Sequence, residues 1–204
     1  MPNETLTAQS SAKTRTMVKL AVLSVVAFLL QYVDFPLPFL FPAFLKIDFS
    51  DVPALIGAFS LGPFMGVVIE LLKNILHFIF KNETAGVGEF ANFITGASLV
   101  YVAGLYYFRK KSRTNALIGM ILGTIFMAIL MSVANYYVFL PLYEKFLGFP
   151  MSAIIQMGTA ANPAITDLKT LVVIGILPFN IIKGAMICII TFLLYKKLSP
   201  ILHE

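Results

Sequence analysis

The chain has 204 residues, of which 59% are hydrophobic and only 12% are charged, and its mean hydropathy is +0.89. Soluble domains carry about twice that charged fraction, so the composition excludes an ordinary soluble domain and indicates an integral membrane protein. The net charge of +5 does not indicate nucleic-acid binding, because the basic residues cluster at the ends of apolar runs. The lone Cys188 excludes a disulfide framework or a thiol metal cluster within one chain.

The N-terminal segment is polar and differs from the rest of the chain. We expect residues 1–16 to be a disordered cytoplasmic tail and residues 17–204 to form one membrane domain. The first apolar run leads into Gln31 and a proline-containing segment, with no small-residue cleavage site. We therefore interpret this run as a retained helix and not as a signal peptide.

Six apolar runs predict an all-α membrane protein with six transmembrane helices. The second and third runs are separated only by Gly62 and Pro63, which should end or kink a helix. Gly119 and Gly123 have the four-residue spacing that lets neighbouring helices pack closely. The predicted spans are 17–33, 52–62, 63–80, 88–108, 115–140 and 169–196.

The charges on the connecting segments predict the topology. Basic residues gather at alternate connections, and by the positive-inside rule both termini are cytoplasmic. An even number of helices agrees with that orientation. The basic groups are Lys13, Arg15 and Lys19, then Arg109, Lys110, Lys111 and Arg113, then Lys196 and Lys197.

The outward connections are long and unusually apolar. Residues 34–51 are rich in proline and phenylalanine, and residues 141–168 form a second long segment. The inner connections are short and basic. Long loops in compact domains are often lids or binding elements, so we expect the protein to capture a molecule from outside.

Lys183 lies in the middle of an apolar run, and Asn180 lies three residues before it, on the same helical face. An ionisable side chain at membrane depth is costly unless it faces a cavity or a partner. A structural pair with Glu70 is the simpler alternative. We favour a cavity-facing pair, because an ammonium that donates and an amide that donates and accepts suit a ligand with carbonyl and ring-nitrogen edges.

Asn135 lies in the fifth predicted span, beside Tyr136 and Tyr137. A membrane asparagine commonly serves only to hydrogen-bond a neighbouring helix. The adjacent tyrosines favour a binding role, because a flat ligand needs both a stacking surface and an amide.

Glu70, Lys73 and His77 follow one another at single helical turns. We expect Glu70 and Lys73 to form an internal ion pair, and the single histidine to be structural and not a metal ligand. The alternative is a small membrane enzyme or channel that uses these three residues. The chain has no phosphate-binding loop and no metalloprotease or serine-hydrolase motif, so we expect no catalytic residue, metal or cofactor.

Three stretches resemble the S-components of energy-coupling factor (ECF) vitamin transporters, in particular the riboflavin-binding type. They are "FPAFLKIDFSDVPALIGAFSLGPFMGVVIELLKNILH", "GVGEFANFITG" and "FNIIKG". The resemblance covers nearly all of the chain from residue 17. It implies a six-helix membrane protein that binds the vitamin from outside with high affinity.

The resemblance also implies a set of ligand-binding residues. In the riboflavin-binding type, an asparagine of the fifth helix and an Asn-x-x-Lys of the last helix bind the isoalloxazine ring, and Asn135, Asn180 and Lys183 match them. In this family the outer loop between the first two helices caps the pocket. We therefore expect contacts from that loop, namely from Leu40, Phe41 and Phe44.

Proteins of this family work with a transmembrane T-component and two ATPase subunits, which the resemblance implies as partners here. S-components often dock through an Ala-x-x-x-Ala pattern on the first helix. This chain departs from that pattern, because Val25 follows Ala21 at that spacing. Ala21 and Ser24 could still form a small-residue stripe for docking.

The sequence thus predicts a riboflavin-capturing subunit in a prokaryotic plasma membrane. An S-component for another vitamin remains an alternative. Thiamin is disfavoured by the Asn-x-x-Lys and by the scarcity of acidic residues that could neutralise a cationic ligand.

Overall fold

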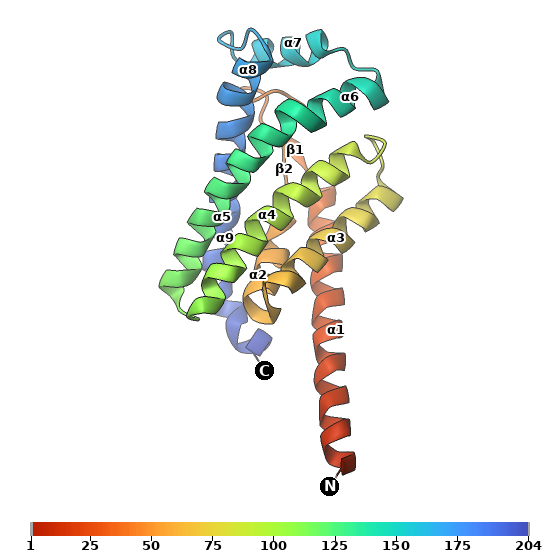
Figure 1. The fold of residues 1–204 in the computed structure, drawn as a ribbon, viewed down its shortest axis with the longest axis vertical. Coiled ribbons are helices and arrows are strands. Elements are labelled where there is room, and N and C mark those ends of the chain that lie inside the picture. Colours follow the sequence, from red (N-terminus) through yellow and green to blue (C-terminus); the bar gives the residue numbers. More distant parts are fainter. Residues whose placement is uncertain (1, 204) are drawn as a thin grey trace.

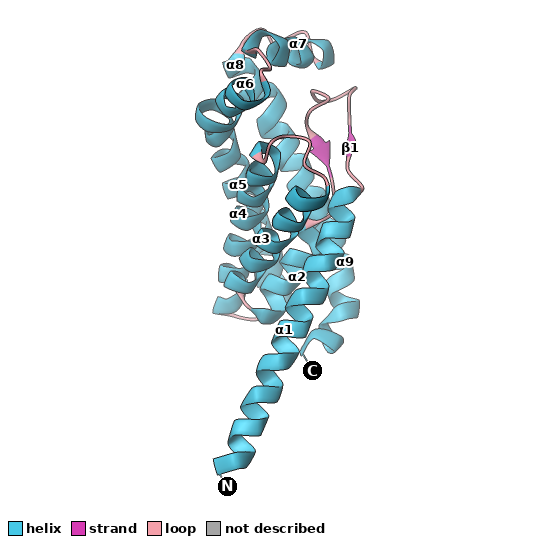
Figure 2. Cartoon of the chain, turned by 90° about the vertical axis from the view of Figure 1, so that its right-hand side faces the viewer, coloured by secondary structure: helices cyan, strands magenta, loops and turns pink. Residues whose placement is uncertain are grey.

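The computed structural model describes residues 2–203 of the chain and the side chains of residues 13–194. Helices pack side by side into an elongated bundle, with a small two-stranded hairpin near one end (Figures 1 and 2). The elements in chain order are α1 (Pro2–Tyr32), β1 (Phe35–Pro36), β2 (Lys46–Ile47), α2 (Asp51–Leu61), α3 (Pro63–Phe80), α4 (Val87–Arg109), α5 (Arg113–Ala134), the π-helix η1 (Asn135–Phe139), α6 (Leu140–Leu147), α7 (Met151–Ala161), α8 (Leu168–Thr170), the π-helix η2 (Leu171–Ile176) and α9 (Leu177–His203).

The predicted helical membrane fold is confirmed in outline, and each predicted span coincides with a helix, although α1 begins 15 residues before the first predicted span and α9 ends seven residues after the last one. Within the described part of the chain, five helical segments are long and apolar enough to cross a membrane. α2 has only 11 residues and is shorter than a span, so the six-span layout stays a prediction. α1 begins at Pro2, so its helical backbone includes most of the segment expected to be disordered, and the division at residue 16 stays a prediction.

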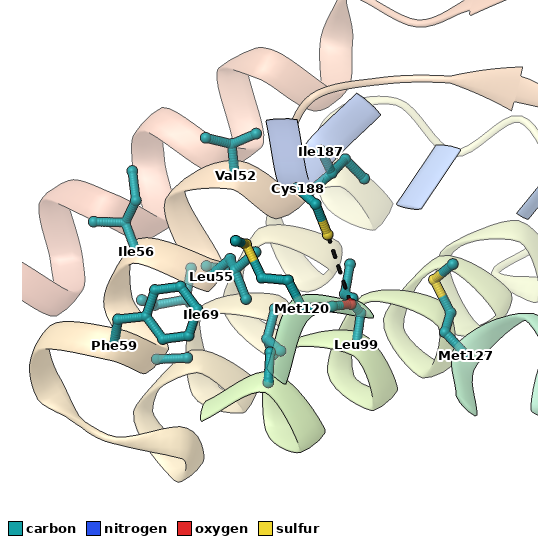
Figure 3. Packing of buried hydrophobic residues seen from close by; sticks show 14 of the residues in the cluster. Val52, Leu55, Ile56, Phe59, Ile69, Leu99, Met120, Met127, Ile187 and Cys188 are labelled. Carbon is teal, nitrogen blue, oxygen red and sulfur yellow. Dashed lines mark hydrogen bonds between the residues drawn. The ribbon is translucent and has the colours of Figure 1, made fainter. Parts of the chain in front are cut away.

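The break between α2 and α3 occurs at Gly62, as predicted. Gly62 has a φ of +115°, in the region that favours glycine, and Pro63 takes the first position of α3. This turn lets α2 fold back into the centre of the bundle, where it contacts α1, α3, α4 and α9. α2 is buried from Asp51 to Phe59, so its apolar residues form the middle of the core (Figure 3).

Two glycines of α5 bring it close to α4. A Cβ on Gly119 would lie 2.7 Å from the Ala103 carbonyl oxygen, and a Cβ on Gly123 would lie 2.7 Å from that of Leu99. The predicted close packing at these two glycines is confirmed. Figure 3 shows the apolar side chains that fill this part of the bundle, among them Met120 and Leu99.

Two helices widen into π-helical turns in the same half of the bundle. η1 continues α5, and η2 leads into α9. Pro141 and Pro178 follow these turns. A proline lacks the N–H of a regular helix and crowds the carbonyl four residues earlier, so the turn before it opens. Such π-helical turns occur frequently at functional sites.

The two ends of the bundle differ. Both chain ends and the α4–α5 connection lie at one end, whereas the hairpin and α6–α8 lie toward the other (Figures 1 and 2). The basic cluster Arg109–Arg113 is therefore at the same end as the termini, an arrangement consistent with the predicted topology.

Candidate functional site: a polar cavity under the outer loop

A cavity of about 210 Å³ lies beneath the loop that carries β1 and β2. Its walls come from this loop, from the α3–α4 connection and from α1, α3, α4, α5, η1, α6 and α9. Four of the predicted binding residues line it together: Phe44, Asn135, Asn180 and Lys183.

The amides of Asn135 and Asn180 have the same local geometry. The Asn135 side-chain nitrogen donates to the Met131 carbonyl oxygen (2.8 Å), and that of Asn180 donates to the Ile176 carbonyl oxygen (2.9 Å). Each bond fixes which way the amide points. Among the described residues no donor reaches either amide oxygen, so both oxygens can accept a hydrogen bond from a ligand.

Lys183 is 3% exposed and ends at the cavity wall. Its ammonium lies 3.0 Å from the Asp48 carboxylate and 3.8 Å from that of Asp51. The simpler alternative, a structural ion pair, is therefore correct in part. The partners of Lys183 are Asp48 of the outer loop and Asp51 of α2, and not Glu70. Lys183 lies at the cavity and in an ion network at once.

The ion network continues beneath the cavity through Lys73. The Lys73 ammonium forms a very short ion pair with Asp51 and lies 2.7 Å from both Glu70 and the Ser50 hydroxyl. The side chains of Lys73, Asp51 and Glu70 are fully buried. The predicted ion pair of Glu70 and Lys73 is confirmed.

Asp48 connects this network to the outer loop. Its carboxylate accepts hydrogen bonds from the backbone N–H and hydroxyl of Ser50, from Lys183 and, at 3.5 Å, from the Asn92 amide. Burial alone would raise the pKa of Asp48. The charges of Lys183 and Lys73 and the bonds from Ser50 outweigh burial and hold that pKa well below its ordinary value, so Asp48 is a carboxylate.

The three loop residues expected to contact a ligand have different positions. Phe44 lines the cavity. Phe41 is buried and packs edge-on against Phe179, with ring centroids 5.3 Å apart, so it supports the wall from behind. Leu40 is 63% exposed and does not line the cavity in this structure.

The tyrosines expected to stack on a ligand point elsewhere. Tyr136 and Tyr137 are exposed, pack against each other and do not line the cavity. Tyr143 and Phe179 are the aromatic side chains that join Phe44 in the wall. A second space of about 250 Å³ shares Phe44 and Tyr143 with this cavity, and most of the rest of its lining is apolar, including Leu140 and Ile154.

A cluster of exposed ion pairs holds the outer loop to the α3–α4 connection. Lys46 lies 2.9 Å from Asp34 and 3.6 Å from Glu83, and Lys81 lies 3.2 Å from Asp34. Burial would raise the pKa of Asp34, but the hydrogen bonds and charges of the two lysines lower it. The bond to Asp34 in turn raises the pKa of Lys46, so both groups are charged at neutral pH.

The acidic residues at the cavity were not anticipated. Asp34, Asp48, Glu83 and Glu89 all line it, so the expected scarcity of acids near the site is wrong. Each of them faces a basic side chain of the protein; for Glu89 this is His77, at 3.0 Å. His77 is thus paired with a carboxylate, and no group of three candidate metal ligands occurs among the residues whose side chains are described.

The two predicted docking residues are one turn apart on α1 but differ in exposure. Ala21 is exposed. Ser24 is buried, and its hydroxyl donates to the Leu20 carbonyl oxygen. Of these two residues, Ala21 is therefore the one that a partner could contact directly.

Comparison with known proteins agrees with this architecture. Residues 15–195 match the family model for the ECF transporter, substrate-specific component. The chain is 40% identical over 190 residues to the riboflavin transporter RibU of Staphylococcus aureus (strain TCH60), covering 93% of each chain. It is 40% identical over 196 residues to the riboflavin transporter FmnP of Bacillus subtilis (strain 168), covering 94% of this chain and 96% of that one.

The fold is similar to a solved structure of the S component of a bacterial ECF transporter, with a TM-score of 0.75 and 38% identity. That match covers 94% of this chain and 99% of the solved one. These relatives are transport proteins, so the protein is not an enzyme and the role of Glu70, Lys73 and His77 in catalysis is set aside. The chain belongs to the substrate-specific components, or S-components, of ECF transporters.

Proposed function

We propose that the chain captures riboflavin in the cavity beneath the outer loop, with high affinity and from outside the cell. The proposal rests on the convergence of Asn135, Asn180 and Lys183 on one cavity, which shares wall residues with a mainly apolar space. The isoalloxazine ring has a matching division, with an apolar dimethylbenzene end and a pyrimidine edge of carbonyl oxygens and an N–H. The relatives named riboflavin transporters support the same ligand.

The polar side chains of the cavity complement the donors and acceptors of this pyrimidine edge. Lys183 is a donor and would bind a ring carbonyl oxygen, whereas the oxygens of Asn135 and Asn180 would accept the ring N–H. Phe44, Tyr143 and Phe179 supply aromatic surface for the flat ring. Affinity then comes from burial of the ring and from satisfaction of its polar edge.

Binding of a vitamin panel to the detergent-purified wild-type protein tests this proposal. We expect riboflavin to bind and to give the protein a yellow flavin absorbance, whereas thiamin and biotin should not compete. Tight binding of another vitamin with no riboflavin binding would contradict the proposal and favour a different S-component specificity.

We further propose six transmembrane helices in a prokaryotic plasma membrane, with both termini cytoplasmic. The position of the basic 109–113 cluster beside the termini supports this orientation. In a Cys188→Ala background, an impermeant reagent added to intact cells should label Thr166→Cys but not Lys111→Cys. Labelling of both from outside would overturn the orientation.

The chain has no nucleotide-binding loop, and a binder alone can only equilibrate a vitamin across a membrane. We propose that a T-component and two ATPase subunits supply the coupled free energy, and that the T-component approaches α1 near Ala21. In proteoliposomes the chain alone should bind riboflavin without concentrating it. Adding the partners should give ATP-dependent uptake, and Ala21→Trp should block uptake while sparing binding. Concentration by the isolated chain under a proton gradient would contradict this division of labour.

A further inference from the structure

The buried ion network beneath the cavity contains more acids than bases. The carboxyl groups of Asp48, Asp51 and Glu70 face two ammonium groups, those of Lys73 and Lys183, and all five residues are buried. Within the described part of the chain, every ion pair of these three acids goes to one of the two lysines. Two positive and three negative charges would leave a net negative charge in an apolar surrounding, which is strongly unfavourable. One of the three acids should therefore hold a proton.

Glu70 is the acid with the least support for a negative charge. Neither of its side-chain oxygens accepts a hydrogen bond within the described part of the chain. The Lys73 ammonium lies 2.7 Å from Glu70 Oε2, but this contact does not have the direction of a hydrogen bond. By contrast, Asp48 and Asp51 each accept a hydrogen bond from a lysine. Hydrogen bonds to a carboxylate favour its charged form, so Glu70 is the least favoured of the three to be ionised.

The positions of the three acids relative to the helix ends point the same way. Asp51 is the first residue of α2, and Asp48 lies just before it. The N-terminus of a helix carries a partial positive charge, which stabilises anions there. Glu70 lies in the interior of α3, more than a turn from either end of that helix. The fields of the helices therefore favour charge on Asp48 and Asp51 and leave Glu70 as the acid to be neutral.

The surroundings of Glu70 have room for a proton but not for a metal ion. A Cβ on Gly96 of α4 would overlap the Glu70 carboxyl group, so that helix packs directly on it. Glu70 and Asp51 line neither the polar cavity nor the mainly apolar space beside it. The next charged groups along α3 and α4, His77 and Glu89, pair with each other. A proton is therefore the cation that can neutralise the network without a space of its own.

We propose that Glu70 is a proton-binding site and carries its proton at neutral pH, so that two ammonium groups face two carboxylates. Asp51 is then the counter-ion of Lys73, and Asp48 is the counter-ion of Lys183. Glu70 contacts Lys73 as a neutral carboxyl group. Lys183 thereby keeps its charge at the cavity wall without needing a charged ligand. This proton site is independent of which molecule the cavity binds.

The pH dependence of unfolding tests the site, by comparison of the full-length wild-type protein with Glu70→Gln in detergent. A glutamate in an unfolded chain releases its proton above about pH 4.3, so folding at higher pH takes up one proton in the wild type and none in the variant. We expect the unfolding equilibrium constant of the wild type to rise by about tenfold per pH unit relative to that of Glu70→Gln, between about pH 5.5 and about pH 7.5. The variant should fold, because glutamine has the shape and charge of a protonated glutamate.

Glu83→Gln is the matched control. Its side chain is 59% exposed, so this variant should have the pH dependence of the wild type. Parallel pH profiles of the wild type and Glu70→Gln would overturn the proton site. So would a Glu70→Gln variant that does not fold under conditions in which the wild type does.

Infrared spectroscopy at neutral pH gives a second readout. The wild type should show the carbonyl band of a protonated carboxyl group that is shielded from solvent, and Glu70→Gln should lack this band. Asp51→Asn should lack it as well, because Glu70 then ionises to balance the charge of Lys73. A band that persists in either variant would contradict the assignment of the proton to Glu70.

Discussion

Helices α5 and α9 behave differently in their two halves. Toward the end that holds the chain termini they are regular, and they pack closely through Gly119, Gly123 and Gly184. Toward the cavity both widen into π-helical turns and carry the amides of Asn135 and Asn180. The same two helices therefore provide a tightly packed anchor at one end and an irregular, polar binding wall at the other.

The two halves should therefore be destabilised by different kinds of substitution. In the packed half the nearest neighbour of Gly119 and of Gly123 is a backbone carbonyl oxygen, which cannot move aside, and Gly184 packs directly on the buried Thr124 side chain. In the cavity half the constraint is electrostatic, because charged groups are buried and must stay paired. This contrast can be tested by substitutions that remove a buried charge from the cavity half or add side-chain volume to the packed half.

The largest effect is expected from Lys73→Met. Lys73 is fully buried and pairs with Asp51 and Glu70, so its loss leaves buried carboxylates without a counter-ion. We expect the free energy of unfolding to fall by about 3–5 kcal/mol, measured by thermal or denaturant unfolding in detergent.

Lys46→Met is the matched control for that substitution. Its side chain is 39% exposed, and exposed ion pairs contribute about 0–1 kcal/mol. A loss of stability in Lys73→Met no larger than in Lys46→Met would show that the buried network is not needed for folding.

A smaller effect is expected from Gly123→Ala in the packed half. The added Cβ would meet the Leu99 carbonyl oxygen at 2.7 Å, so α4 and α5 must separate. Overpacking of this kind costs about 1–3 kcal/mol, which the same unfolding measurement would report.

Gly175→Ala, in η2, is the control from the cavity half. Its Cβ would meet its nearest neighbours at 3.6 Å, an ordinary contact. We expect this variant to be neutral or more stable by up to about 1 kcal/mol, because alanine favours helix. If Gly175→Ala were as destabilising as Gly123→Ala, the contrast between the halves would be wrong.

The sequence predicted those parts of the site that stand out from an apolar background. Asn135, Asn180 and Lys183 were recognisable because a polar residue within a membrane run needs a reason. The helix break at Gly62 was recognisable because glycine and proline have specific backbone requirements. Each of these residues could be recognised from the few residues on either side of it.

The rest depends on contacts between distant segments. Lys183 and Asp48 are 135 residues apart, and nothing in the sequence around either residue points to the other. No local pattern reveals such a pair. Gln31 and Asn92, which also line the cavity, were missed for the same reason, since they lie near helix ends, where polar residues are ordinary. The π-helical turns had a usable signal in Pro141 and Pro178 that was not interpreted.

The central claim is that Lys183 serves a ligand and not only the ion network. The direct measurement is a titration of riboflavin, followed by flavin fluorescence, into wild-type protein, Lys183→Met and the double variant Lys183→Met/Asp48→Asn. The double variant removes the carboxylate charge that the single substitution would leave unpaired, so it separates binding from stability. We predict that binding weakens by about 1.5–3 kcal/mol in both variants, the contribution of a hydrogen bond to a charged group. Wild-type affinity in the folded double variant would contradict the account.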